Sequence, residues 1–208
     1  MGNTRGNKYS TGHTTLNAET SPEYWYNTIP DYQAKYDVPA FIEKVKELSH
    51  VKKVAYIGHS MGSRGMLLNL EQNGTYYKEN VNFVTLLSPF VELHGTSLIN
   101  YIIVLGNIFI DDYRPDGIHY YKSFENPSAL ATAFKYVCGY AGWYCDFWSL
   151  YMSHSTGEYN DKEKSKVFFS KYPAQSSFKA WKYMKQLLDT GKPYLYDFGT
   201  EENMKRYG

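Results

Sequence analysis

The feature that most constrains the fold is a serine flanked by glycines at the junction of a buried strand and a helix. Residues 51–57 are β-branched and aromatic, which predicts a strand that stops at Gly58. Residues 64–70 are helix formers with an apolar side, which predicts a helix directly afterwards. Between them lies the run Gly58-His59-Ser60-Met61-Gly62. Because its glycines let strand and helix approach closely, we expect a strained turn that exposes the Ser60 hydroxyl.

This turn assigns chemical roles to its residues. Ser60 is the candidate nucleophile of the strand-turn-helix arrangement called a nucleophile elbow. The backbone N–H of Met61, at the start of the helix, is the candidate donor to an oxyanion. We expect His59 to pack beside the turn, because a base must reach the serine oxygen from the far side of a cleft. A glycine-rich turn without chemistry is the alternative, and the flanking strand and helix favour the elbow.

A serine nucleophile also needs a base and an acid, and the sequence identifies neither. Three histidines follow Ser60, namely His94, His119 and His154. None of them follows a core strand that comes after an acid-bearing strand, which is the order typical of such a site. We therefore assign none of them as the base and expect surface or capping roles.

The order of elements predicts an α/β fold. A helix capped by Asp37 and ending near His50 precedes the first strand, and a second strand follows at residues 81–87. Between the strands, Asn73-Gly74 is expected to end the intervening helix. Alternation of this kind is typical of a parallel sheet with right-handed crossovers.

Beyond Pro89 the alternation stops. Aromatic and aliphatic stretches there predict a helical insertion, with helices near residues 97–110, 126–138 and 176–190. The chain then turns at Gly191-Lys192-Pro193 and extends over residues 194–199.

Composition excludes some classes of function. Lys plus Arg number 22 and Asp plus Glu 21 among 208 residues, so the net charge of +1 gives no reason to expect nucleic acid or an anionic membrane as partner. The 22 tyrosines suit a surface that meets apolar ligands while staying wet on one side, but codon usage or ordinary half-buried packing is the favoured explanation. The longest apolar stretch, residues 98–110, is too short and too interrupted to span a membrane.

The chain has two cysteines, Cys138 and Cys145, which are compatible with a disulfide or with two buried thiols. Neither has a partner at C-x-x-C spacing and no histidine cluster accompanies them, so metal catalysis is disfavoured and no cofactor is implied. The N-terminus lacks the charged and apolar regions of a signal peptide, which leaves the location of the protein open.

Several motifs in order resemble the acid lipase family, which includes gastric lipase and lysosomal acid lipase. The matching pieces are Gly2-Asn3-Thr4-Arg5-Gly6-Asn7, Ala34-Lys35-Tyr36-Asp37-Val38-Pro39-Ala40, Tyr56-Ile57-Gly58-His59-Ser60-Met61-Gly62, Leu87-Ser88-Pro89 and Tyr196-Asp197-Phe198-Gly199. Family members usually carry Gln where this chain has Met61. The change is tolerable, because the oxyanion donor is a backbone N–H.

The resemblance implies a domain organisation. Residues 1–90 would form part of an α/β-hydrolase core, residues 91–190 a helical cap over an apolar acyl-binding cleft, and residues 191–208 a return toward the core. The family carries cysteines in its cap, which favours pairing of Cys138 with Cys145. Its pattern begins before Met1 and continues after Gly208 with the catalytic Asp and His. We therefore expect an incomplete gene model or a fragment, rather than a degenerate relative.

The resemblance also implies a function, namely hydrolysis of carboxylic esters of neutral lipids, such as acylglycerols or steryl esters, through an acyl-enzyme on Ser60. A lipid–water interface is the expected meeting place with the substrate, and a secretory or lysosomal location is typical of the family. Two rivals remain: an acyltransferase of the same fold, and a non-catalytic lipid-binding or interaction module.

Overall fold

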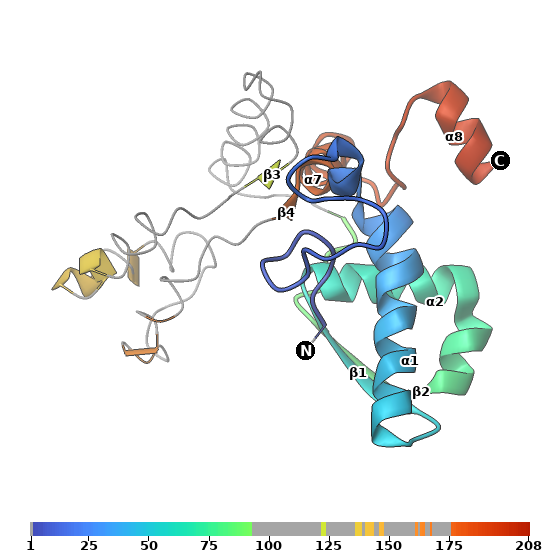
Figure 1. Ribbon diagram of the computed structural model, residues 1–208, viewed down its shortest axis with the longest axis horizontal. Helices are drawn as coiled ribbons and strands as arrows, with labels where there is room; N and C mark the ends of the chain where they lie inside the picture. The colour runs from blue at the N-terminus through green and yellow to red at the C-terminus, as the bar shows by residue number, and fades with distance from the viewer. Residues whose placement is uncertain are drawn as a thin grey trace. The chain divides into compact units, whose positions relative to one another are not determined.

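The computed structural model describes two long stretches of the chain, residues 2–92 and 176–208 (Figure 1). It also describes residues 122–123, 136–138, 140–143, 146–147, 161, 163–164 and 167. By its internal contacts the chain divides into two compact units, unit 1 with residues 1–121 and 177–208, and unit 2 with residues 122–176. The predicted helices at 97–110 and most of 126–138 lie outside the described residues.

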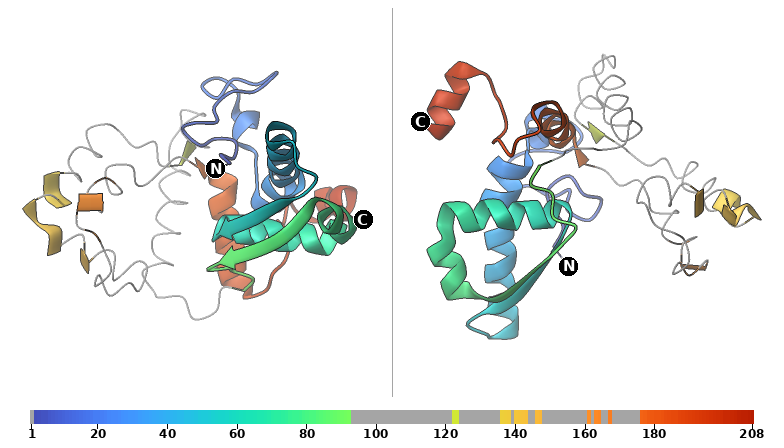
Figure 2. Two further views of the ribbon diagram at one scale, coloured as in Figure 1. Left: turned by 90° about the horizontal axis from the view of Figure 1, so that it is seen from below. Right: turned by 180° about the vertical axis from the view of Figure 1, so that it is seen from behind.

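Unit 1 carries a parallel two-stranded sheet made of β1 (Val54–His59) and β2 (Val81–Leu87). The strands lie side by side, with His59 opposite Leu87 where both end (Figure 2). They are joined by α2 (Met61–Asn80), which follows the turn at Ser60. The predicted strand-helix-strand order is therefore confirmed, and Ser60 stands at the carboxyl end of β1.

The first core is a cluster of apolar side chains that covers one face of this sheet. It is formed by α1 (Val38–Ser49), α2 and the strand residues that point toward them. Its members are Val38, Ile42, Met66, Tyr77 and Val81, with Val54, Tyr56, Val84 and Leu86 packed against them. Pro39 in the first turn of α1 has a backbone geometry that suits a helix start. The opposite face of the sheet carries Ile57 and Phe83, which are 69% and 62% exposed.

A second core joins α2 to α7 (Phe178–Thr190), a helix far away in the sequence. Ile29, Leu68, Tyr183 and Leu187 are buried together there. Beside them the guanidinium of Arg64, 2% exposed, donates to the Tyr183 hydroxyl at 2.9 Å and to the Pro193 carbonyl oxygen at 3.1 Å. These bonds attach the beginning of α2 to α7 and to the segment that follows it.

The second core bears on the predicted domain boundaries. Residues 177–190, assigned by resemblance to the cap, belong to unit 1, because the apolar side of α7 packs on α2. Unit 2 begins at residue 122 and falls wholly within the predicted cap range of 91–190. The cap itself stays a prediction.

Three local predictions were wrong in detail. The first strand begins at Val54 rather than at residue 51. The helix after the turn does not end at Asn73-Gly74 but kinks at Asn73, which has φ −146°, and continues to Asn80. Asp37 makes no side-chain cap, because the π-helix η2 (Ile29–Asp37) runs directly into α1 and leaves Asp37 in helical conformation.

Shorter elements complete the described part of the chain. A 3₁₀ turn η1 (Pro22–Trp25) buries Tyr24 and Trp25 in the N-terminal segment. The C-terminal helix α8 (Thr200–Tyr207) was not predicted. The strands β3 (Lys122–Ser123) and β4 (Ser176–Ser177) pair as a second small sheet. Among the described residues, no helix combines the length and the apolar character that crossing a membrane requires.

Candidate active site

The backbone at Ser60 has the strained geometry expected of an elbow. Its φ is +50° and its ψ is −108°, a region that residues other than glycine rarely occupy. A residue held in such a conformation costs about 1–3 kcal/mol and persists only where its surroundings enforce it. Ser60 is partly exposed and His59 is exposed. The turn thus keeps the serine at the surface of the fold at the expense of local stability.

Two neighbouring groups enforce this turn through the backbone of Ser60. Its N–H donates to the Leu87 carbonyl oxygen at 2.9 Å, which fixes it to the end of β2. Its own carbonyl oxygen accepts the Arg64 N–H at 3.0 Å, the first hydrogen bond of α2. The strand end and the helix start are therefore both bonded to the serine.

The two glycines of the motif have different roles. A Cβ on Gly58 would lie 2.8 Å from the Gly62 carbonyl carbon and 2.8 Å from Tyr56 Cε1, both too close for contact. A Cβ on Gly62 would meet only the Tyr56 hydroxyl, at 3.6 Å, which is an ordinary contact. Gly58 is therefore the position where strand and helix touch.

Two side-chain hydroxyls support the turn from the buried side. Ser63, fully buried, has its Oγ 2.8 Å from the Gly58 carbonyl oxygen and 3.0 Å from that of Leu87. Tyr56 donates its hydroxyl to the Gly62 carbonyl oxygen at 2.9 Å. Burial raises the pKa of Tyr56, so its hydroxyl keeps the proton that it donates. Both hydroxyls bind carbonyl oxygens beside the elbow.

Replacing Ser63 with alanine is expected to lower the free energy of unfolding by about 1–2 kcal/mol, because the variant leaves a buried carbonyl oxygen short of a donor. Urea unfolding followed by circular dichroism measures this loss. Ser49→Ala is the matched control, since Ser49 is exposed on α1 and should change stability by no more than about 0.5 kcal/mol. Equal midpoints for both variants would show that the Ser63 hydroxyl does not hold the turn.

Among the described residues, no histidine forms a hydrogen bond with the Ser60 side chain. His59, which directly precedes Ser60, is exposed. His13 accepts backbone hydrogen bonds from Thr15 and Leu16, and His50 caps the end of α1. The three histidines that follow the serine, His94, His119 and His154, lie outside the described residues. The expectation that these three histidines have surface or capping roles therefore stays a prediction.

The carboxylate of Asp197, in the motif Tyr196-Asp197-Phe198-Gly199, has a structural role. It accepts the Gly199 N–H at 2.8 Å and the Asn203 amide at 2.7 Å. These two hydrogen bonds hold the pKa of the Asp197 carboxyl below its usual range. It therefore begins the turn into α8. Within the described part of the chain, no three His, Cys, Asp or Glu side chains gather as a metal site would require.

An apolar residue follows the end of each strand of the sheet. Met61 follows Ser60 directly, and Phe90 follows the end of β2. Both are partly buried and pack against the second core. Both residues therefore add apolar contacts to the second core.

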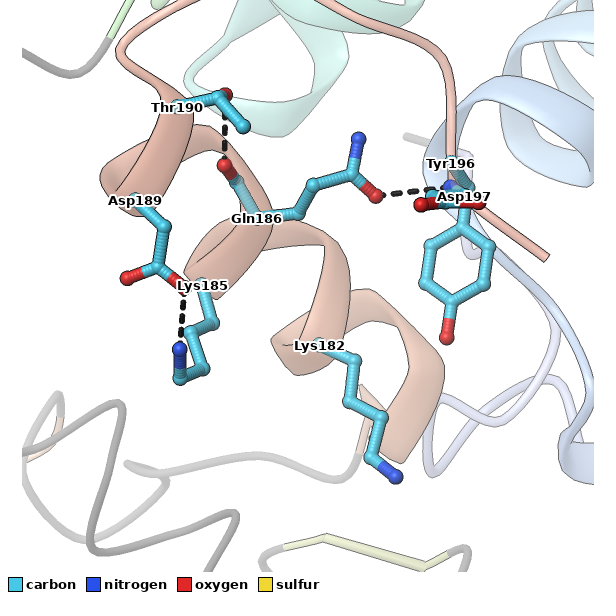
Figure 3. Close-up of a pocket in the computed structure, with 7 residues that line it drawn as sticks. All are labelled: Lys182, Lys185, Gln186, Asp189, Thr190, Tyr196 and Asp197. Atoms are coloured by element: carbon cyan, nitrogen blue, oxygen red, sulfur yellow. Dashed lines mark hydrogen bonds and ion pairs between the residues drawn. The ribbon is translucent and has the colours of Figure 1, made fainter. Parts of the chain in front are cut away.

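A surface pocket of about 320 Å³ lies away from the elbow, between α7 and residues 196–197 (Figure 3). Its polar groups bond mainly to one another. Lys185 pairs with Asp189, and the Gln186 amide accepts the Asp197 N–H at 2.8 Å and donates to the Leu195 carbonyl oxygen at 2.6 Å. The pocket has neither a histidine nor a serine, so we do not assign it catalytic chemistry.

The predicted cysteine pair is only half described. Cys138 is 4% exposed and disulfide-bonded. Cys145, the other cysteine of the chain, lies outside the described residues. Their pairing stays a prediction.

Sequence reasoning missed the support for the turn. Ser63 and Tyr56 carried no signal that distinguishes them from ordinary helix and strand residues. Their position gave one indication: both lie within four residues of Ser60, where a strained turn needs hydrogen-bond donors. Arg64 was likewise treated only as a helix former, and its contacts with α7 are not local in sequence.

The sequence model of the α/β-hydrolase fold matches residues 1–124, which include the elbow and both strands of the sheet. The chain is similar to lipase lipl-3 of Caenorhabditis elegans, with 26% identity over 212 residues that cover 100% of this chain and 52% of the worm protein.

A human and a plant lipase match to a similar extent. Human lipase member N is 28% identical over 214 residues, covering 100% of this chain and 51% of that protein. Triacylglycerol lipase 2 of Arabidopsis thaliana is 28% identical over 215 residues, covering 100% of this chain and 48% of the plant protein. The chain therefore spans about half the length of the curated relatives that it matches.

Proposed function

This chain belongs to the α/β-hydrolase fold family, and from that premise we propose that it provides the nucleophile for hydrolysis of carboxylic esters of neutral lipids. The observation that carries the proposal is the positive φ of Ser60 at the end of β1, immediately before α2. Ser60 is partly exposed there, at the carboxyl end of β1, as a nucleophile elbow requires. The names of the relatives support a lipase. That the whole protein acts as a lipase is part of the proposal.

In the proposed reaction, the Ser60 hydroxyl oxygen bonds to the ester carbonyl carbon while a base takes its proton. The Met61 N–H, at the free N-terminal end of α2, donates to the oxyanion that develops. Collapse breaks the ester C–O bond, and the alcohol leaves with the proton. Water then repeats these steps on the acyl-enzyme and releases the fatty acid. A histidine and an acid outside the described contacts of Ser60 would move the protons.

Neutral lipid esters, such as acylglycerols or steryl esters, are the proposed substrates. The partly buried Met61 and Phe90 support an acyl site beside the nucleophile, since both are apolar. We propose that a helical cap from within residues 91–190 completes this site and that Cys138 pairs with Cys145 inside it. The proposal needs no cofactor.

The test is covalent labelling of Ser60 by an alkyl fluorophosphonate in the native polypeptide that carries these 208 residues. Such a probe reacts with a serine only where a base activates it. We expect one adduct, located by peptide mass spectrometry on the peptide that contains Ser60. A labelled protein that converts an ester and an alcohol to new ester in preference to free acid would be an acyltransferase. An unlabelled Ser60 in folded protein would instead support a non-catalytic lipid-binding module.

A further inference from the structure

The guanidinium of Arg64 is a buried charge in the first turn of α2, directly after the elbow. Arg64 is 2% exposed. Among the described residues its guanidinium binds neutral oxygens, the Tyr183 hydroxyl at 2.9 Å and the Pro193 carbonyl oxygen at 3.1 Å. Burial of a charge is costly, and neutral acceptors offset less of that cost than a carboxylate does. The presence of a charge at this position therefore needs an explanation.

Packing alone does not call for a charged residue here. Met61 lies three residues before Arg64 and Leu68 four residues after it, so all three share one face of α2. Met61 and Leu68 both pack in the second core, which an apolar residue at position 64 would simply extend. A buried polar group kept among apolar neighbours can serve to fix one particular arrangement of the elements that it joins. Arg64 has such elements within reach of its guanidinium.

One of these elements is the extended segment 193–196, which forms neither helix nor strand. Each of its carbonyl oxygens accepts a hydrogen bond from a side chain rather than from a neighbouring strand. The donors are, in order along the segment, Arg64 of α2, Tyr183 and Gln186 of α7, and Tyr207 of α8, at 3.1, 3.0, 2.6 and 3.0 Å. Side chains of three helices therefore hold this segment.

Arg64 is the donor among these four that also belongs to the elbow. Its backbone N–H donates to the Ser60 carbonyl oxygen at 3.0 Å, while its side chain binds the segment 193–196. One residue thus joins the nucleophile to that segment and to α7. Met61, the candidate oxyanion donor, and Leu195 of the segment both pack against the second core. The start of α2 is therefore attached on this side by polar and by apolar contacts.

We propose that Arg64 is a positioning residue for the nucleophile. By binding Tyr183 and Pro193 it holds the first turn of α2, and with it the Ser60 oxygen and the Met61 N–H, in the geometry that attack on an ester requires. This inference rests on the proposed function, because it assigns Arg64 a part in the same reaction. A shift of about 1 Å in reacting groups costs on the order of 10²-fold in rate, so a loss of this attachment should appear in kcat.

The test measures kcat and KM of the native polypeptide that carries these residues, on a soluble p-nitrophenyl ester. Arg64→Met keeps the length of the side chain and removes its donors, whereas Tyr183→Phe keeps the ring and removes the hydroxyl. Each variant is expected to lower kcat by about 10- to 100-fold and to change KM by less than about two-fold, since the geometry of the reacting groups changes and substrate binding does not.

Two further variants examine the link itself. In the double variant, kcat should fall little further than in the more damaged single variant, because both substitutions break the same hydrogen bond. Arg64→Lys keeps a cationic donor and should recover part of the kcat that Arg64→Met loses. Parental kcat in both Arg64→Met and Tyr183→Phe would overturn the proposal, as would fully multiplicative losses in the double variant.

Gln186→Met is the matched control. Gln186 binds the same extended segment, at the Leu195 carbonyl oxygen and the Asp197 N–H (Figure 3), but these bonds join the segment to α7 and not to α2. The variant should lower the midpoint of urea unfolding, as Arg64→Met does, and keep kcat within about two-fold of the parent. Equal losses of kcat in Gln186→Met and Arg64→Met would contradict the proposal, because any loosening of the segment would then have the same effect.

Amide hydrogen exchange reports on the elbow without turnover. The N–H groups of Ser60 and Arg64 are both hydrogen-bonded, to the carbonyl oxygens of Leu87 and Ser60. Their exchange should become about ten-fold faster or more in Arg64→Met and Tyr183→Phe, and stay unchanged in Gln186→Met. Unchanged exchange and kcat in variants of a hydrolysing parent would overturn the positioning role alone. A parent that does not hydrolyse esters would overturn the proposed function, whereas faster exchange in its variants would still show that Arg64 holds the turn.

Discussion

Replacing Ser60 with alanine is expected to lower ester hydrolysis by the native polypeptide that carries these 208 residues by about 10⁴-fold or more. Alanine cannot form the acyl-enzyme, and the next serine along the chain, Ser63, is fully buried and bonded to carbonyl oxygens. The variant should fold like the parent, because the main-chain hydrogen bonds of residue 60 remain. Turnover of a soluble p-nitrophenyl ester, at matched concentrations of folded protein, measures the loss.

Ser88→Ala is the matched control for this experiment. Ser88 also has a positive φ, of 46°, and follows the end of β2 just as Ser60 follows the end of β1. It has an exposed side chain and no proposed chemistry, so its variant should retain most of the activity. Unchanged turnover in Ser60→Ala would remove Ser60 from the mechanism. Equal losses in both variants would indicate that the strained turns, rather than the nucleophile, limit the rate.

The elbow was the most predictable part of the molecule. Its strand, turn and helix are contiguous, so the pattern of residues 51–70 contains nearly all the information that they need. The second strand at 81–87 was predicted for the same reason. The predicted α/β-hydrolase core, with its likeness to lipases, is confirmed by the family match and by the lipase relatives.

Errors arose where one segment depends on a distant one. The helix α2 continues past Asn73-Gly74 because Tyr77, beyond the kink, is buried in the first core. The π-helix η2 is held partly by Asn69 of α2, whose amide donates to the Ala34 carbonyl oxygen at 2.8 Å. Neither contact is visible in a local pattern of apolar residues.

The candidate site shows the same division between local and distant information. Ser60, Gly58 and their turn follow from a five-residue motif. The hydroxyl of Ser63 reaches the Leu87 carbonyl oxygen, 24 residues away in sequence, and the guanidinium of Arg64 reaches Tyr183, 119 residues away. Such contacts depend on how the strands and helices pack, which no motif encodes. Neither the motif nor the described contacts assign the base or the acid.

Replacing Gly58 with alanine is expected to lower the free energy of unfolding by about 1–3 kcal/mol or more, because the added methyl overlaps backbone atoms rather than a flexible side chain. The new Cβ would lie 2.8 Å from the Gly62 carbonyl carbon and 2.9 Å from its oxygen. Relief requires α2 to move away from β1, which displaces Ser60 and the Met61 N–H together. A shift of about 1 Å in reacting groups costs on the order of 10²-fold in rate, so ester hydrolysis should fall with stability.

Two other glycines distinguish this collision from a general effect of added methyl groups. Gly62→Ala places its Cβ 3.6 Å from the Tyr56 hydroxyl, and Gly74→Ala meets nothing within 4 Å. Both residues lie in α2, where alanine is favoured over glycine by about 0.5–1 kcal/mol, so both variants should be as stable as the parent or slightly more so. Urea unfolding and ester turnover, measured on all three variants, test whether an added methyl group is more damaging at Gly58 than at Gly62 or Gly74. If Gly62→Ala were as damaging as Gly58→Ala, the close approach of strand and helix at Gly58 would not be what the motif requires.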